Sequence, residues 1–154
     1  MYFMRPILLK VITFLVVSFC VGNITAQTQN AWEVFEKTEF KKTFVKEYGM
    51  FMTWPAFTDD ILKWQGKEVM IAGYIIPTAE AGGFEGIIIS KYPYAMCFFC
   101  GEAGIESVAE LRLKNNKANF KMDKLYVFKG KLLLNDSDFD QLNFILTDVE
   151  LMDL

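Results

Sequence analysis

The chain has 154 residues, of which 53% are apolar and 16% aromatic, and its formal net charge is −3. This composition excludes a disordered chain, and the length suits one domain. The chain has three cysteines and no histidine, which excludes a Ser-His-Asp triad, a Cys-His dyad and any histidine metal ligand.

Residues 1–26 have the pattern of a signal peptide. Arg5 and Lys10 form a basic start and precede the apolar run VITFLVVSFCV, which is followed by small residues. We expect cleavage near Ala26/Gln27 and a location in the periplasm or outside the cell. The apolar run is shorter than the about 20 residues of a membrane span. We therefore expect membrane contact through this segment only if it is left uncleaved.

Cleavage would change the counts that bear on function. The loss of 26 residues leaves a mature chain of 128 residues, in which Cys97 and Cys100 are the cysteines that remain. The loss of Arg5 and Lys10 from 16 basic residues leaves 14 against 19 acidic ones, a formal net charge of −5. Export would place both cysteines in a compartment where disulfides form and persist.

Residues 27–66 are expected to form an N-terminal extension. Residues 31–48 fit a helix only with a break between Phe35 and Phe44, and the Phe, Thr and Val content of the second half favours a strand. This stretch is therefore left open between strand and helix. Residues 58–66 then predict a short helix, in which Thr58 is the N-cap, Asp59 and Asp60 lie in the first turn and Gly66 is the stop.

Residues 67–154 are expected to form a β-barrel. Strand patterns lie at 69–76, 84–90, 108–113, 125–134 and 142–151. VMIAGYI and YVFKGKL both have glycine at their fifth position, where it permits a bend, a bulge or a close backbone approach. Long bent strands allow a small sheet to close on itself. We predict a mainly β fold, a small OB-fold-like closed or partly open antiparallel barrel preceded by a short helix packed at one end. The alternative is a small open sandwich.

The most distinctive segment is residues 91–107, KYPYAMCFFCGEAGIES, which we call the Cys loop. A disulfide between Cys97 and Cys100 requires a turn, because extended residues three apart point to opposite faces. The nearby glycines and the oxidising compartment favour this interpretation. Alternatively, the two thiolates are half of a zinc site that Glu102, Glu106 or a second copy of the chain would complete.

A third interpretation of the same motif is thiol–disulfide catalysis by Cys97 and Cys100. The spacing matches thioredoxin-type enzymes, but the pattern shows no long helix after the first cysteine. The carboxylates of Glu102 and Glu106 and the apolar Phe98 and Phe99 would oppose a thiolate.

The aromatic residues of the Cys loop allow two interpretations. Tyr92, Tyr94, Phe98 and Phe99 are either buried plugs at one end of the barrel or, where two or more are exposed, a patch for a ligand or partner.

Two further classes of function are excluded by pattern. The mature charge of −5, with Arg112 as the remaining arginine, and the acidic segment 135–140 oppose nucleic-acid binding. The segment that begins at Asp136 starts like an EF-hand loop, but Gln141 and Thr147 stand where glycine and glutamate are needed. A hydrogen-bonded turn is expected there instead.

The segments GKEVMIAGYIIP, YPYAMCFFCGEAGIESV and FKGKLLLND resemble a group of small exported bacterial proteins of unknown function. The resemblance covers residues 54–151 and implies export and an OB-like barrel with a CFFCG-x-AG-x-ES loop. It brings no catalytic residue, and Ile105 stands where that pattern has proline.

Together these features predict a non-enzymatic exported domain with a binding or a structural role. In the binding role, the Cys loop contacts an unknown protein, metal or small ligand, and in either role Cys97 and Cys100 form a disulfide or half of a metal site. Zinc is the cofactor that the two cysteines would accept. The alternative is a periplasmic thiol-redox protein that uses Cys97 and Cys100.

Overall fold

The structure is a computed structural model that describes residues 29–76, 87–115 and 120–152. The predicted signal peptide and the first residues of the strand pattern at 84–90 lie outside these ranges. So does the Gly82-Gly83 pair, for which the sequence indicates a turn. Within the described ranges, no helix has both the length and the apolar character needed to cross a bilayer.

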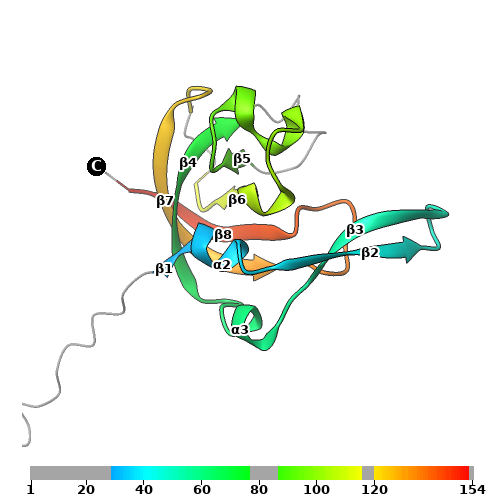
Figure 1. The fold of residues 1–154 in the computed structure, drawn as a ribbon. Helices are drawn as coiled ribbons and strands as arrows, with labels where there is room; N and C mark the ends of the chain where they lie inside the picture. The colour runs from blue at the N-terminus through cyan, green and yellow to red at the C-terminus, as the bar shows by residue number, and fades with distance from the viewer. Residues whose placement is uncertain (1–28, 77–86, 116–119, 153–154) are drawn as a thin grey trace, which may run out of the picture.

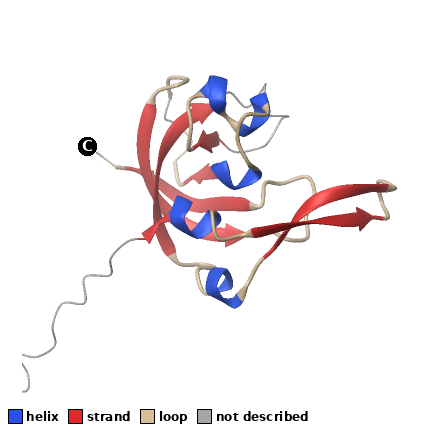
Figure 2. Ribbon diagram, in the orientation of Figure 1, coloured by secondary structure: helices blue, strands red, loops and turns tan. Residues whose placement is uncertain are grey.

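The described residues are mainly β (Figure 2). The strands are β1 (Gln29–Asn30), β2 (Glu39–Val45), β3 (Met50–Ala56), β4 (Glu68–Ile76), β5 (Ile87–Ser90), β6 (Val108–Leu113), β7 (Leu125–Leu134) and β8 (Phe144–Leu151). The helices are short, namely α2 (Ala31–Phe35), α3 (Asp59–Leu62) and the 3₁₀ helices η1 (Tyr94–Met96), η2 (Phe98–Cys100) and η3 (Ile105–Ser107).

Five of the strands close into a barrel (Figure 1). They follow one another in the order β4-β5-β6-β8-β7, and β7 pairs again with β4. The β6–β8 pair is parallel and the other four are antiparallel. This order, with the third strand beside the fifth, is that of an OB-fold. The predicted small β-barrel is therefore confirmed, in its closed form.

The two strand glycines lie where backbones approach closely. A Cβ at Gly73 would collide with the carbonyl oxygen of Ser90. A Cβ at Gly130 would lie 2.9 Å from Val149 Cγ2 and 3.0 Å from the carbonyl oxygen of Thr147. The β7–β8 register also shifts beside Gly130, and β8 carries the extra residue Asp148 at φ 53°. The predicted close approach and bulge are both present.

The N-terminal extension contributes to the barrel core. Trp32 and Phe35 of α2 are buried with the inward residues of β4–β8. The ring of Phe35 stacks on that of Phe144 at 4.0 Å, and Trp32 Nε1 donates to the carbonyl oxygen of Ala72 at 2.7 Å. The stretch left open by the sequence is thus a short helix, a break and then the strand β2 (Figure 1).

Helix α3 begins where the sequence predicted a helix. Thr58 is its N-cap residue, although its side chain makes no capping hydrogen bond. Asp60 pairs with Lys63 at 2.8 Å, and the hydrogen bond from Lys63 lowers the pKa of the Asp60 carboxyl. Ile61 is fully buried in the main core, so α3 packs against the barrel. Gly66 follows with φ 72°, which favours glycine.

Strands β2 and β3 form an antiparallel hairpin that projects from the barrel (Figure 1). One side of the hairpin packs on the segment before β8. Trp54 Nε1 donates to the carbonyl oxygen of Asp136 at 2.5 Å, and the Trp54 ring lies 4.1 Å from that of Phe139. Tyr48 contacts Phe139 from the hairpin turn. The sequence indicated a strand on the β2 side but did not predict the hairpin.

Candidate functional site

The Cys loop packs on the outer face of strands β5 and β6. Ile89 and Ala109 point into the main core, so their neighbours Ile88 and Val108 point outward. These outward side chains form a second buried cluster, whose members are Ile76, Ile88, Cys97, Val108 and Leu142. The short helices of the loop cover one end of the barrel (Figure 2). The loop is therefore held on the barrel by a small apolar core of its own.

Three 3₁₀ helices shape the loop, and turn residues separate them. Pro93 begins η1, Cys97 lies between η1 and η2, and Gly101 ends η2 with φ 80°. A Cβ at Gly104 would meet only the carboxylate end of the Glu106 side chain, which can rotate away. Ile105, which replaces the proline of the pattern, is the first residue of η3. The turn that a Cys97–Cys100 bridge requires is present.

The two cysteines have opposite exposures. Cys97 is fully buried, whereas Cys100 lies at the surface, and the structure does not join them. The N–H of Cys100 donates to the carbonyl oxygen of Cys97 at 3.1 Å, which closes a turn between them. Such turns hold the two Cα atoms within about 7 Å, which overlaps the about 4.4–6.8 Å that a disulfide spans. The Cys100 thiol donates to the carbonyl oxygen of Tyr94 at 3.1 Å.

The zinc interpretation requires further ligands beside Cys97 and Cys100. Among the residues that the structure describes, no three Cys, Asp or Glu side chains are grouped so as to hold a metal ion. Glu106 turns toward Gly104, and Glu102 is exposed. The described residues therefore do not fit a zinc ion held by one chain.

The four aromatic residues divide into two groups. Tyr94, Phe98 and Phe99 are partly buried against the second cluster, and the rings of Phe98 and Phe99 meet edge to face at 5.4 Å. Tyr92 is 37% exposed, with Lys91 Nζ 5.6 Å from its ring. Met96, which the sequence did not single out, is exposed as well. Three of the four aromatic residues therefore pack, partly buried, on the outer face of β5 and β6, and Tyr92 is the one of the four that is exposed.

Two long-range contacts tie the loop to the rest of the molecule. Lys91 Nζ forms an ion pair with Glu36, just after α2, and this hydrogen bond raises the pKa of Lys91. The N–H of Tyr94 donates to Asp123 Oδ1 at 2.9 Å. Sequence reasoning missed both contacts, because nothing local links partners 55 and 29 residues apart.

A buried carboxylate lies in strand β6. Glu110 is 1% exposed, and Arg112 Nε donates to its Oε1 at 2.8 Å. Arg112 Nη2 also donates to Gln141 Oε1 at 2.8 Å, which links β6 to the segment before β8. A buried carboxylate needs such a partner. The sequence indicated Arg112 only as the one arginine of the mature chain. In the structure it pairs with Glu110 and holds Gln141.

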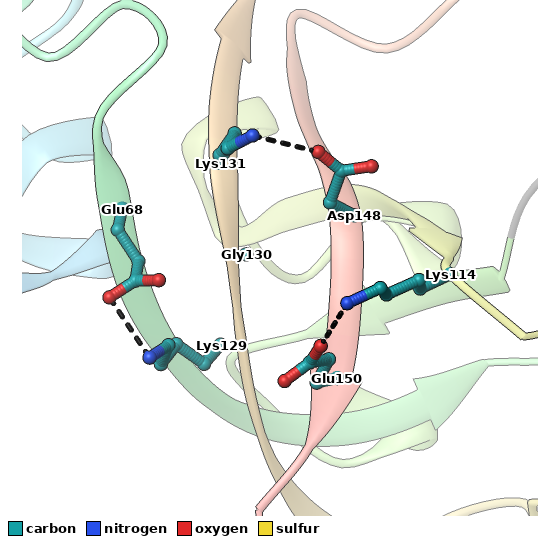
Figure 3. Close-up of a pocket in the computed structure, with 7 residues that line it drawn as sticks. All are labelled: Glu68, Lys114, Lys129, Gly130, Lys131, Asp148 and Glu150. Atoms are coloured by element: carbon teal, nitrogen blue, oxygen red, sulfur yellow. Dashed lines mark hydrogen bonds and ion pairs between the residues drawn. The ribbon is translucent and has the colours of Figure 1, made fainter.

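A charged groove of about 270 Å³ lies elsewhere on the barrel, along β4, β7 and β8 (Figure 3). Gly130 lies at its centre between Lys129 and Lys131. Three ion pairs line it, Glu68–Lys129 at 3.0 Å, Lys131–Asp148 at 3.0 Å and Lys114–Glu150 at 2.8 Å. Its charges are already balanced in pairs, and none of the candidate site residues predicted from the sequence lies in it.

Comparison with known proteins leaves the family of this chain open. No protein-family model matches the sequence, and no curated protein matches it. Among solved structures, the chain is similar to a DUF3299 family protein from Pseudomonas aeruginosa PAO1, with 13% sequence identity and a TM-score of 0.43. That match covers 65% of this chain and 68% of the other.

Proposed function

We propose that the protein is an exported, non-enzymatic binding domain that recognises a protein or small ligand through the Cys loop. In the exported chain, Cys97 and Cys100 form a disulfide that fixes this loop on the barrel. The proposal rests on one observation: the turn of η2 joins a cysteine at the surface to a cysteine in the small core beneath the loop.

The position of the loop supports a binding role. Ligands of OB-folds bind at the face of the second and third strands and at two loops, the one between the first and second strands and the one between the fourth and fifth. In this chain those strands are β5 and β6, and the Cys loop covers their outer face. A ligand at that face would meet Tyr92, Met96 and Cys100. An OB-like fold indicates a place of binding and no particular ligand.

The disulfide has a defined chemical balance. Two thiols lose two electrons and two protons, and a disulfide donor of the export compartment accepts them as it becomes two thiols. The ring that closes is short, so little stabilisation of the whole chain is expected from chain entropy. The bond acts on the loop instead, because it ties the surface residue Cys100 to a residue held by Ile88 and Val108.

The exposure of Cys100 also favours the alternative, thiol–disulfide exchange. In that reaction the Cys100 thiolate would attack a substrate disulfide, and Cys97 would then displace the substrate's second thiol. The surroundings oppose it, because a low thiol pKa needs nearby positive charge. Lys91, the one lysine of the loop, is paired with Glu36, and Glu102 follows Cys100 closely.

Photo-crosslinking in the native host tests the binding role. A photoreactive phenylalanine analogue at position 92 or 96 is expected to give a discrete covalent adduct. The same analogue at Met122, which is exposed outside the loop, serves as the matched control and is expected to give none. The proposal is wrong if positions 92 and 96 give no adduct, or the same adducts as position 122.

A turnover assay separates the alternative from the proposal. The oxidised mature chain is mixed with a dithiol and a protein substrate that contains disulfides. We expect stoichiometric reduction of the chain's own bond and no turnover. Catalytic turnover that Cys100→Ser abolishes would establish exchange as the function.

A further inference from the structure

Strands β2 and β3 each carry one exposed phenylalanine. Phe44 is 51% exposed and Phe51 is 69% exposed. They are directly opposite in the register and meet edge to face at 5.2 Å. The pair forms a small continuous apolar surface on adjacent strands.

The two faces of the hairpin differ in chemistry. Side chains alternate along each strand, so Trp54 points away from the face of Phe51. The Trp54 side is covered by Phe139 and by the acidic segment 135–140. The other side begins at the barrel with Phe40 and Pro55. Its outer part, which we call the open face, consists of Lys42, Phe44, Phe51 and Thr53.

Positive charge gathers at the open face of an acidic protein. Lys42 lies beside Phe44 on this face, and Lys46 follows β2 at the turn. Neither forms an ion pair with the residues that the structure describes, whereas Lys41 pairs with Glu39 at 3.4 Å. The whole chain has a net charge of −3. The two lysines at the open face therefore complement an anionic surface.

The area of the aromatic pair argues against a protein partner. At roughly 200 Å² for each phenylalanine side chain, the exposed parts amount to about 240 Å². A stable protein interface buries about 800 Å² on each partner. The lysines on β2 also discourage strand pairing at its free edge. A lipid surface requires no shape complementarity, because phenylalanine side chains enter the boundary between headgroups and acyl chains and lysines reach the phosphates.

We propose that the open face of the β2–β3 hairpin docks on the surface of an anionic phospholipid bilayer. Phe44 and Phe51 enter the boundary between headgroups and acyl chains, and Lys42 and Lys46 contact lipid phosphates. The binding is weak and reversible, because two rings supply little buried area. It is independent of the Cys loop, which lies on a different part of the barrel (Figure 1).

Vesicle co-sedimentation of the mature chain tests this proposal. The vesicles contain phosphatidylcholine alone or phosphatidylcholine with phosphatidylglycerol. We expect binding to the anionic vesicles that falls with added salt, and none to the neutral ones. F44S combined with F51S, and K42E combined with K46E, are each expected to lower the partition coefficient about tenfold.

Matched controls alter other exposed positions. M122S combined with L125S removes exposed apolar side chains of the barrel end, and K121E reverses a lysine outside the hairpin. Both controls are expected to bind as the parent chain does.

Several results would overturn lipid docking. These are no sedimentation with either vesicle, equal binding to neutral vesicles, or equal losses in the controls. A dimer seen by analytical ultracentrifugation and abolished by F51S, without vesicle binding, would make the open face an interface between copies.

Discussion

Gly73 shows at the scale of one residue how the barrel closes. Its missing Cβ leaves room for the carbonyl oxygen of Ser90 on β5. The sequence predicted this kind of role, because a glycine within a long strand pattern has few other uses. It could not predict which backbone would approach, because that depends on strand pairing.

The substitution Gly73→Ala is expected to destabilise the protein by about 1–3 kcal/mol, because the methyl group must displace a backbone carbonyl. Urea denaturation of the mature chain measures the change in the free energy of unfolding. Ala72→Ser, at the exposed neighbouring position, should stay within about 0.5 kcal/mol of the parent. Equal stability of both variants would contradict the close approach.

The Lys114–Glu150 pair of the charged groove makes the stability of the fold depend on pH. The hydrogen bond from Lys114 lowers the pKa of Glu150, so this pair stabilises the fold at neutral pH. That contribution is lost as the pH falls through the lowered folded-state pKa of Glu150. NMR titration of the carboxyl carbons is expected to show a midpoint below the ordinary glutamate range, and Lys114→Met should restore the ordinary midpoint. An ordinary midpoint in the parent chain would contradict the pair.

Several residue contacts lay beyond prediction from the sequence. Lys91 and Glu36, and likewise Arg112, Glu110 and Gln141, meet only after folding brings distant segments together. The turn at Cys97 and Cys100 was predictable, because proline and glycines surround it. The exposure of the two cysteines was not, because it depends on where the loop packs.

At the scale of elements, strands with one buried face were predicted best. Strands β6 and β7 have the bounds that their alternating patterns indicated, and β4 and β8 differ only at one end. The hairpin β2–β3 was missed because neither of its faces is fully buried, so its residues show no clean alternation. Helix α2 is too short for a helical period to appear.

The contrast between two phenylalanines tests how the extension contributes to stability. Phe35→Ala removes a fully buried ring stacked on Phe144 and is expected to cost about 3–5 kcal/mol. Phe44→Ala removes an exposed ring and should cost less than about 0.5 kcal/mol. Thermal or urea denaturation distinguishes them. Similar small losses in both variants would show that α2 does not belong to the barrel core.

At the scale of the whole molecule, the Cys loop covers the face of the barrel that binds ligands in other OB-folds, the outer face of β5 and β6. The closed strand order removes the edges of the barrel sheet. The Cys loop then covers β5 and β6, and the hairpin projects beyond the barrel. The sequence predicted the barrel from its strand patterns and glycines. It could not place the loop on a particular face. Both faces of β5 are apolar, because Ile88 and Ile89 are both buried, and the sequence does not show which of them points into the barrel.

The central claim is that the Cys97–Cys100 turn is closed by a disulfide in the exported protein. The most direct measurement is the intact mass of the mature chain, purified from the export compartment and alkylated without reduction, with its zinc content. The account predicts no alkylation, no zinc, and two alkylations only after reduction. Two alkylations before reduction, or stoichiometric zinc that Cys97→Ser removes, would contradict it.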